Sequence, residues 1–166
     1  VVAEAVLAAL LLVTAPVVVV DDIVLRAGRA RLPLRHVGRV ATFDAARTLV
    51  LEAYGDFSPR LAEIAGLFFE RRWIDAELRP GKRGGAFSAS TIPSAHPYVL
   101  LNYTGTLRDV MTVAHELGHG VHQYLSRARG LFEMDTPLTT AETASVFGEM
   151  LTFRRLLREE RDPGVR

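Results

Sequence analysis

The sequence predicts a mainly α-helical domain of the α+β class. After residue 40, apolar residues recur at helical spacing in several stretches. Three pairs of residues have the spacing of helix starts: Ser58-Pro59, Thr106 with Asp109, and Thr136-Pro137. Only two short stretches, 86–90 and 98–103, are typical of extended chain, so we expect a small β-sheet.

The first twenty residues, VVAEAVLAALLLVTAPVVVV, form an apolar run of the kind found in membrane spans and signal peptides. No initiator Met and no basic segment precede the run, and Glu4 and Pro16 interrupt it. We therefore expect a buried or disordered segment, in a chain cut from something longer, rather than an export signal. A membrane-anchored interaction module that uses residues 1–20 stays as an alternative.

Two scaffold helices are expected next. In the stretch 44–54, apolar residues share one helical face, namely Ala45, Leu49 and Ala53. Ser58 followed by Pro59 is typical of an N-cap and a first-turn proline, which predicts a second helix that runs to about Asp75.

The run RPGKRGG at 79–85 breaks any helix, and extended chain is predicted on either side of a loop that contains proline. Residues 86–90 and 98–103 are therefore expected to pair as an antiparallel hairpin. The glycosylation sequon at Asn102 falls in the second of these stretches, and we interpret it as strand.

The last two helices are expected on either side of a turn near Gly130. Thr106 with Asp109 forms a capping-box pattern, and the apolar positions that follow are Val110, Ala114, Leu117 and Val121. Thr136-Pro137 can start a long final helix that ends in the charged segment RRLLREERD.

Composition limits the possible functions. A chain of 166 residues with 49% hydrophobic residues is long enough for one domain with a core. A formal net charge of +1 gives no reason to expect nucleic acid or an anionic membrane as partner. Because the chain has no cysteine, it has no thiol nucleophile, and any metal must be held by His, Asp or Glu. The lack of cysteine also fits a cytoplasmic location.

The segment His115-Glu116-Leu117-Gly118-His119 is an H-E-x-x-H pattern. On a helix, the two histidines lie one turn apart on the same face, so both imidazoles can bind one tetrahedral ion. Glu116 lies where its carboxylate can take a proton from a water in the open metal position, which makes it the candidate general base. A helix with partly exposed histidines and a solvated Glu is the alternative.

Gly118 and Gly120 favour the metal site, because each costs the helix about 1 kcal/mol relative to Ala. We expect another backbone or a substrate to approach the helix there. A catalytic zinc also needs a third protein ligand, and Glu142 on the following helix is the best available carboxylate. Its other possible role is capping-box partner of Thr139.

Ser145 and Glu149 share one side of the final helix with Glu142, so the side chains on this side could hydrogen-bond metal-bound histidine rings. A surface salt bridge is the alternative for Glu149. His122 continues the histidine face by another turn, but three successive turns do not easily converge on one ion. We expect it to pack against or support the ligands.

Three segments carry a resemblance to a known family: GKRGGAF, PYVLLNYTGTLRDVMTVAHELGHGVHQYLS and TAETASVFGEM. They are similar to the oligoendopeptidase F branch of the thimet oligopeptidase family of zinc metallopeptidases. The resemblance runs from about residue 42 to 160. It implies a zincin-like, mainly helical (α+β) metallopeptidase core with a small antiparallel β-sheet beside the metal.

This resemblance implies one Zn²⁺ per chain, held by His115, His119 and Glu142, with Glu116 as general base. The implied activity is that of a zinc metalloendopeptidase that hydrolyses short oligopeptides. In the family, the peptide adds as a strand along the sheet edge, and Gly85, Ala86 and Phe87 match that region. Main-chain hydrogen bonds suit this role because they hold peptides of many sequences.

The same resemblance divides the chain into a poorly matching segment, 1–41, and a partial catalytic domain, 42–166. The family has a later helical region whose His and Tyr residues help to stabilise the tetrahedral intermediate, and the sequence does not match it. A zinc-binding chain without useful catalysis is therefore the alternative function. Short peptides are the expected partners, and nucleic acid and membrane are not.

Overall fold

The computed structural model describes residues 41–159, which form a helical domain with one small sheet. The elements are α2 (Phe43–Phe57), α3 (Pro59–Glu70), β1 (Ile74–Asp75), β2 (Phe87–Ala89), β3 (Tyr98–Leu100), α4 (Leu107–Ser126), the 3₁₀ turn η2 (Arg127–Arg129) and α5 (Leu138–Glu159). The predicted apolar segment 1–20 and the expected boundary at residue 41 involve residues outside this range.

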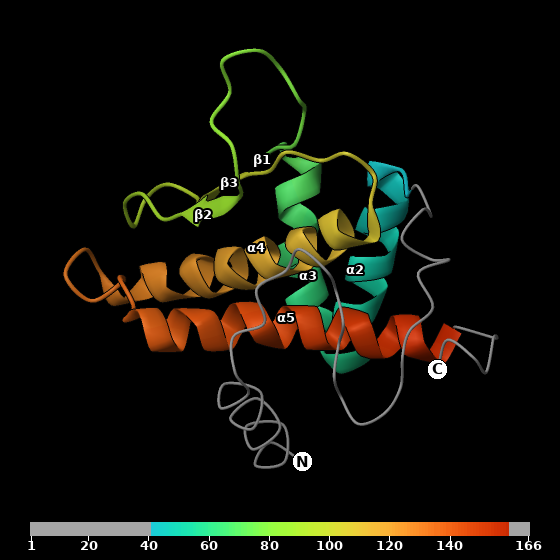
Figure 1. Ribbon diagram of the computed structural model, residues 1–166. Coiled ribbons are helices and arrows are strands. Elements are labelled where there is room, and N and C mark those ends of the chain that lie inside the picture. Colours follow the sequence, from blue (N-terminus) through green and yellow to red (C-terminus); the bar gives the residue numbers. More distant parts are fainter. Residues whose placement is uncertain (1–40, 160–166) are drawn as a thin grey trace.

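Helices α4 and α5 lie side by side across the molecule (Figure 1). The sheet lies against α4 on the side away from α5, α2 packs against both α4 and α5, and α3 packs against α4 and α2. Helix α4 is therefore the central element, with the sheet on one side and α5 on the other. None of the helices within residues 41–159 is long and apolar enough to cross a membrane.

Most of the predicted helix starts are confirmed. The Ser58 side chain accepts a hydrogen bond from the Leu61 N–H and caps α3, with Pro59 in the first turn. The capping box of α4 is present in both directions between Thr106 and Asp109. The last helix begins at Leu138, directly after the predicted Pro137.

The prediction that the helix beginning at Ser58-Pro59 runs to about Asp75 is wrong, because α3 ends at Glu70. Arg72 adopts the left-handed conformation with φ 58°, and the Trp73 N–H donates to the Phe68 carbonyl at 2.9 Å. This is the hydrogen bond of a Schellman helix end, in which an arginine stands where glycine is usual. The chain then turns directly into β1.

The sheet has the strand order β1-β3-β2 and is mixed. Strands β2 and β3 pair antiparallel, as predicted, with Ser88 opposite Val99. Strand β1 pairs parallel with β3, so the expectation of a purely antiparallel sheet is wrong. A parallel partner separated by a long connection gives no hairpin signal in the sequence. Because β3 is central, β2 is an outer strand of the sheet.

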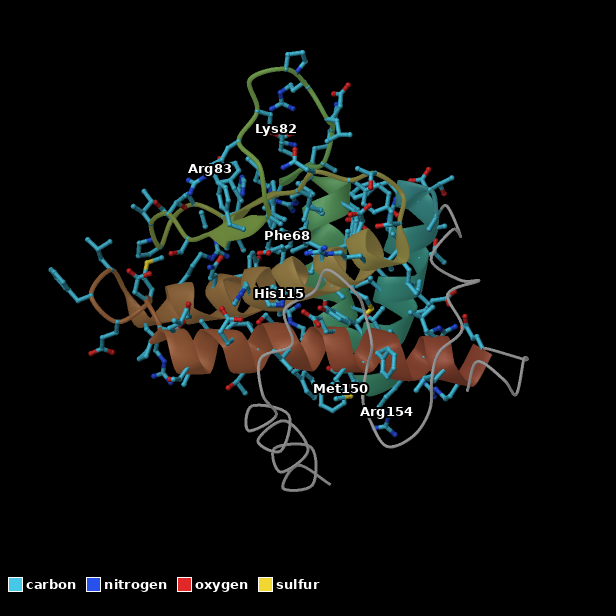
Figure 2. All side chains as sticks on the ribbon, viewed as in Figure 1. Phe68, Lys82, Arg83, His115, Met150 and Arg154 are labelled. Atoms are coloured by element: carbon cyan, nitrogen blue, oxygen red, sulfur yellow. The ribbon has the colours of Figure 1, made fainter. Side chains whose placement is uncertain are left out.

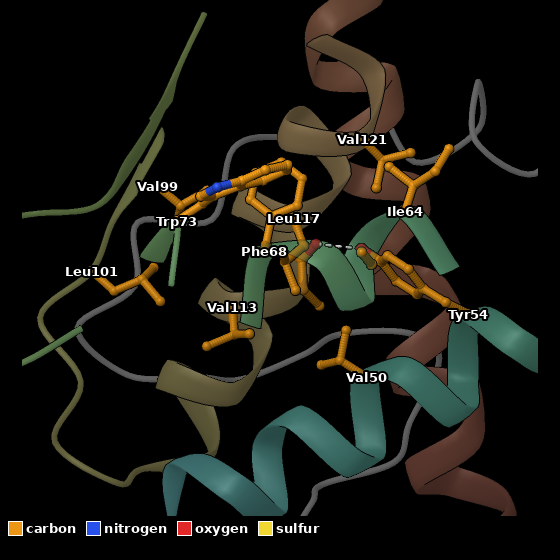
Figure 3. Close-up of a cluster of buried hydrophobic side chains, with 12 residues drawn as sticks. Val50, Tyr54, Ile64, Phe68, Trp73, Val99, Leu101, Val113, Leu117 and Val121 are labelled. Carbon is orange, nitrogen blue, oxygen red and sulfur yellow. Dashed lines mark hydrogen bonds between the residues drawn. The ribbon is translucent and has the colours of Figure 1, made fainter. Parts of the chain in front are cut away.

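A single apolar cluster joins all the layers (Figure 3). Tyr54 from α2 and Phe68 from α3 are fully buried against Leu117 of α4. The Tyr54 hydroxyl donates a hydrogen bond of 2.7 Å to the Ala114 carbonyl, drawn as a dashed line in Figure 3. Burial raises the pKa of Tyr54, so this hydroxyl remains a donor. The core therefore fixes the middle of α4.

Gly148 on α5 sits where three elements meet. A Cβ at this position would lie 2.8 Å from the Ala114 carbonyl oxygen and would overlap the Tyr54 hydroxyl. In contrast, a Cβ at Gly55 on α2 would make only an ordinary contact, at 3.7 Å from the Ala62 Cβ. Packing therefore requires a glycine at position 148 but not at position 55.

We expect Gly148→Ala to lower the free energy of unfolding by about 1–3 kcal/mol, because the added methyl group overpacks the junction of α2, α4 and α5. Gly55→Ala is the matched control and should be neutral or stabilising by up to about 1 kcal/mol, since alanine is the better helix former. Urea denaturation of both variants measures the difference. Equal stability of the two variants would contradict the packing described for Gly148.

Candidate metal centre

Helix α4 presents His115 and His119 on one face, and α5 brings Glu142 opposite them. Glu142 Oε2 lies 3.5 Å from His115 Nε2, and Glu142 Oε1 lies 3.6 Å from His119 Nε2. One ligand atom from each of these residues lies within 4.8 Å of the others. Ligand atoms of a tetrahedral zinc site lie about 3.3 Å apart, given bond lengths of about 2.0–2.1 Å. The two distances from Glu142 are close to this value, so the three side chains form a cluster that could hold one metal ion.

The close packing of α4 and α5 places Glu142 next to the histidines. A Cβ at Gly118 would lie 2.6 Å from the Ala144 carbonyl oxygen and 2.7 Å from the Ser145 Cα. The predicted approach of another backbone at Gly118 thus occurs, and that backbone is α5. Gly120 instead packs against the ring of Phe68, so its small size serves the core and not a substrate.

Glu149, two turns beyond Glu142 on α5, orients the first histidine. Its Oε1 lies 2.5 Å from His115 Nδ1. A proton on Nδ1 that is held by this carboxylate leaves the Nε2 lone pair free to bind a metal. Burial lowers the pKa of His115, but the hydrogen bond and charge of Glu149 outweigh it and raise the pKa overall. Glu149 is thus within hydrogen-bond distance of His115, and its supporting role toward a bound metal stays a prediction.

The other ligand candidates also have supporting contacts. The hydroxyl of Ser145, which is fully buried, lies 3.1 Å from Glu142 Oε2 and 2.9 Å from the Glu142 carbonyl oxygen. His119 interacts with the backbone of Ala141, and burial lowers its pKa, with the neighbouring His115 adding to the decrease. A lowered pKa favours the neutral imidazole, which is the form that binds metal.

Glu116 lies on the side of α4 that faces the sheet. The residue is only 6% exposed, and its Oε2 atom is buried without a hydrogen-bond partner among residues 41–159. Burial raises the pKa of Glu116; His115 opposes this effect, and Glu142 adds to it. Leaving a buried carboxylate oxygen unpaired typically costs about 1–3 kcal/mol or more. An unpaired acceptor of this kind is suited to receive a proton from a reactant.

His122 does not join the cluster. With Val121, Leu125 and Phe147 it lines an apolar groove of about 210 Å³ between α4, α5 and the end of α2 and start of α3. Its ring therefore lies among packing residues. A supporting role toward the ligands stays a prediction.

The residues expected to contact a peptide lie at the start of the outer strand β2. Gly85 has φ 83° and ends the glycine-containing loop, and Phe87 is the first residue of the strand. The Asn102 side-chain amide donates to the Arg83 carbonyl at 3.0 Å and to the Gly85 carbonyl at 2.8 Å. The amide of the predicted sequon is thus used to hold this loop.

Lys82 is a residue whose role the sequence patterns do not reveal. It is the only lysine in the chain, and Figure 2 shows it on the loop between β1 and β2. Its side chain is 3% exposed, and its ammonium group donates to the Asp75 carboxylate and to the carbonyls of Asp75, Glu77 and Leu101. The hydrogen bond with Arg79, aided by Lys82, lowers the pKa of Asp75 to about 2.

These contacts join the loop that precedes β2 to the ends of both other strands. Lysine suits this position because a compact ammonium can point its three donors at several carbonyl oxygens. Lys82 and Asn102 together therefore fix the entry into the outer strand. The sequence does not predict these contacts, because a single lysine in a loop between two strands has no pattern that indicates its hydrogen-bond partners.

Comparisons with known proteins are consistent with this geometry. The sequence model of Peptidase family M3 matches residues 58–163. A second family, described as a protein of unknown function (DUF3093), matches residues 1–78. The chromosomal oligoendopeptidase F of Lactococcus lactis subsp. cremoris is 39% identical over 95 residues, which is 57% of this chain and 16% of that protein. The plasmid-encoded form is 38% identical over 131 residues, covering 78% of this chain and 22% of that protein.

Solved structures share the fold. A protein of Chlamydophila abortus described as a peptidase aligns with a TM-score of 0.70 and 35% identity, over 75% of this chain and 21% of that one. PZ peptidase A, solved with an inhibitor, aligns with a TM-score of 0.63 and 23% identity over 70% of this chain and 21% of that one, which bears on the fold alone. The chain thus spans about a fifth of the length of these relatives.

We expect the Lys82 amine to be acetylated at least roughly tenfold more slowly in the native chain than in urea, because the side chain is buried and engages four acceptors. Treatment with an acetyl N-hydroxysuccinimide ester, followed by peptide mass spectrometry, measures the rate at this single lysine. The synthetic peptide RPGKRGG is the control for intrinsic reactivity. Equal rates for the native chain and the peptide would contradict the buried position.

Proposed function

The chain belongs to Peptidase family M3, and we propose that it carries the metal-binding and general-base residues of a zinc metalloendopeptidase that acts on short peptides. The observation that supports this proposal most strongly is the convergence of His115, His119 and Glu142 across the contact between α4 and α5. Structural zinc sites use four protein ligands, whereas catalytic sites use three and keep one position open.

In this proposal, His115 and His119 would bind the zinc through Nε2 and Glu142 through its carboxylate, with one ion per chain. When bound, zinc would supply Lewis-acid chemistry, which polarises the scissile carbonyl and lowers the pKa of a water molecule. Glu149 and Ser145 would keep the His115 ring and the Glu142 carboxylate in the required orientation.

Glu116 would act as the general base. Its carboxylate would accept a proton from the attacking water and return it to the leaving amine nitrogen, and its burial and unpaired oxygen support this role. A carboxylate that is desolvated on the side facing the sheet is a stronger base than one in water. The same residue thus serves both proton transfers of peptide-bond hydrolysis.

The peptide would lie along the outer strand β2. The sheet packs on the face of α4 away from α5 (Figure 1), and the Ser88 backbone in β2 interacts with the Glu116 carboxylate. An extended peptide can pair with a strand edge through its main chain, so peptides of many sequences are accepted. Short, unfolded peptides and a cytoplasmic location are the substrate class and compartment that we infer.

The second candidate function is metal binding without useful catalysis. Metal binding needs only the three ligand candidates, whereas catalysis also needs donors that stabilise the tetrahedral intermediate, each of which contributes about two to three orders of magnitude to kcat. A zinc-binding assay does not separate the two functions, whereas a peptide-cleavage assay does.

We expect Glu149→Ala to weaken zinc binding by about 10–100-fold, because His115 loses the carboxylate that holds its tautomer and ring orientation. Competition with a fluorescent zinc chelator measures the affinity. The matched control is Glu63→Ala, which removes an exposed carboxylate paired only with Arg60 and should leave the affinity unchanged. The same affinity in both variants would contradict the role of Glu149.

We expect Glu116→Gln to lower the rate of peptide cleavage by about two to four orders of magnitude while zinc binding is retained, since only the proton acceptor is lost. The assay uses a quenched fluorescent peptide of about ten residues with the zinc-loaded chain. Glu63→Gln is the matched control and should cleave like the parent. Stoichiometric zinc binding by the parent chain without any cleavage would contradict the peptidase proposal and favour the second candidate.

A further inference from the structure

A reciprocal pair of hydrogen bonds joins the outer strand β2 to α4. The Ser88 hydroxyl donates to Gln123 Oε1 at 2.7 Å, and Gln123 Nε2 donates to the Ser88 carbonyl at 3.3 Å. Both residues are partly buried. Gln123 thus contacts both the side chain and the main chain of one strand residue.

The contact is unusual because Gln123 binds a main-chain carbonyl of β2 that points away from the rest of the sheet. Val99, which is opposite Ser88 in β3, donates its N–H to the Trp73 carbonyl on the other side of β3. The Ser88–Val99 pair therefore exchanges no main-chain hydrogen bonds, and the polar groups of Ser88 point to the open edge of β2. The Gly85 carbonyl, three residues earlier, points the opposite way, toward Asn102 of the β3 segment.

Gln123 lies seven residues after Glu116, which is two helical turns along the same side of α4. The Ser88 backbone also interacts with the Glu116 carboxylate. Two side chains of α4 therefore meet the main chain of the same strand residue from two points along the helix.

We propose that Gln123 is a positioning residue whose two hydrogen bonds to Ser88, here called the clamp, hold β2 against α4. The edge of the strand then keeps a fixed distance and register relative to Glu116. The clamp holds the outward-facing carbonyl of Ser88, and the outward-facing main-chain groups of Ala86 remain for an incoming peptide. This inference rests on the proposed peptidase function and adds to it the residue that sets where the peptide strand begins to pair.

Four single variants of the full, zinc-loaded chain test the clamp. Gln123→Met keeps the length of the side chain but removes both hydrogen bonds, and Ser88→Ala removes the hydroxyl donor. Ser90→Ala is the matched control, because its hydroxyl makes a hydrogen bond of 3.1 Å to Asp135 and not to α4. Ser88→Thr is the conservative variant, which keeps a hydroxyl group at the clamp.

The first measurement is amide hydrogen exchange of the segment 86–90, which does not depend on catalysis. Loss of two neutral hydrogen bonds should speed exchange there by about tenfold in Gln123→Met, and by less in Ser88→Ala. Ser90→Ala should leave exchange of the Ser88 region unchanged. Unchanged exchange in Gln123→Met, with native circular dichroism, would overturn the clamp.

The second measurement is the kinetics of peptide cleavage. Gln123→Met should raise KM by about tenfold and change kcat by less than about threefold, because the strand edge and not the chemical step is disturbed. The effects of Gln123→Met and Ser88→Ala should not add in the double variant, since both remove the same contact. Ser88→Thr, which keeps a hydroxyl group, should have the same KM as the parent, in contrast to Ser88→Ala.

The two measurements separate the clamp from the function on which it rests. A parent chain that cleaves no peptide would refute the peptidase proposal, and hydrogen exchange alone would still decide whether the clamp exists. Faster exchange in Gln123→Met with an unchanged KM would overturn the positioning role. A decrease in kcat with an unchanged KM would likewise overturn it.

Discussion

The close packing of α4 against α5 is the constraint on which the rest of the structure depends. Two glycines make it possible: Gly118 lets the backbone of α5 approach α4, and Gly148 leaves room for the Tyr54 hydroxyl and the Ala114 carbonyl. At this separation Glu142 lies 3.5–3.6 Å from the two histidine Nε2 atoms, and Glu149 reaches His115 Nδ1.

A second set of contacts positions the sheet over the same helix. The capping box starts α4, Lys82 and Asn102 fix the loop before β2, and Gln123 holds β2 from the helix side. The contacts of Lys82, Asn102 and Gln123 each join distant segments, so the outer strand is held at both its start and its middle. Glu116 follows the ligand candidate His115 directly in α4, so its buried carboxylate lies about 100° around the helix from that ligand and beside the strand edge.

The sequence predicts those parts of the molecule that depend on local chemistry. Periodicity and caps predicted α2, α4 and α5, and the H-E-x-x-H spacing predicted the shared face of His115 and His119. The end of α3 at Glu70 was missed because an arginine occupies the left-handed position where glycine is usual. Strand β1 and the contacts of Lys82 were missed because their partners lie far along the chain, where no local pattern reports the pairing.

The most direct test of this account is the zinc affinity of Gly118→Ala compared with that of Gly55→Ala, measured by calorimetric titration. A methyl group at position 118 would meet the α5 backbone, whereas one at position 55 would make an ordinary contact. The account predicts one zinc per parent chain and binding at least roughly tenfold weaker in Gly118→Ala, with helix content retained and Gly55→Ala unaffected. Equal zinc affinity in both variants would contradict the claim that the spacing of α4 and α5 creates the metal site.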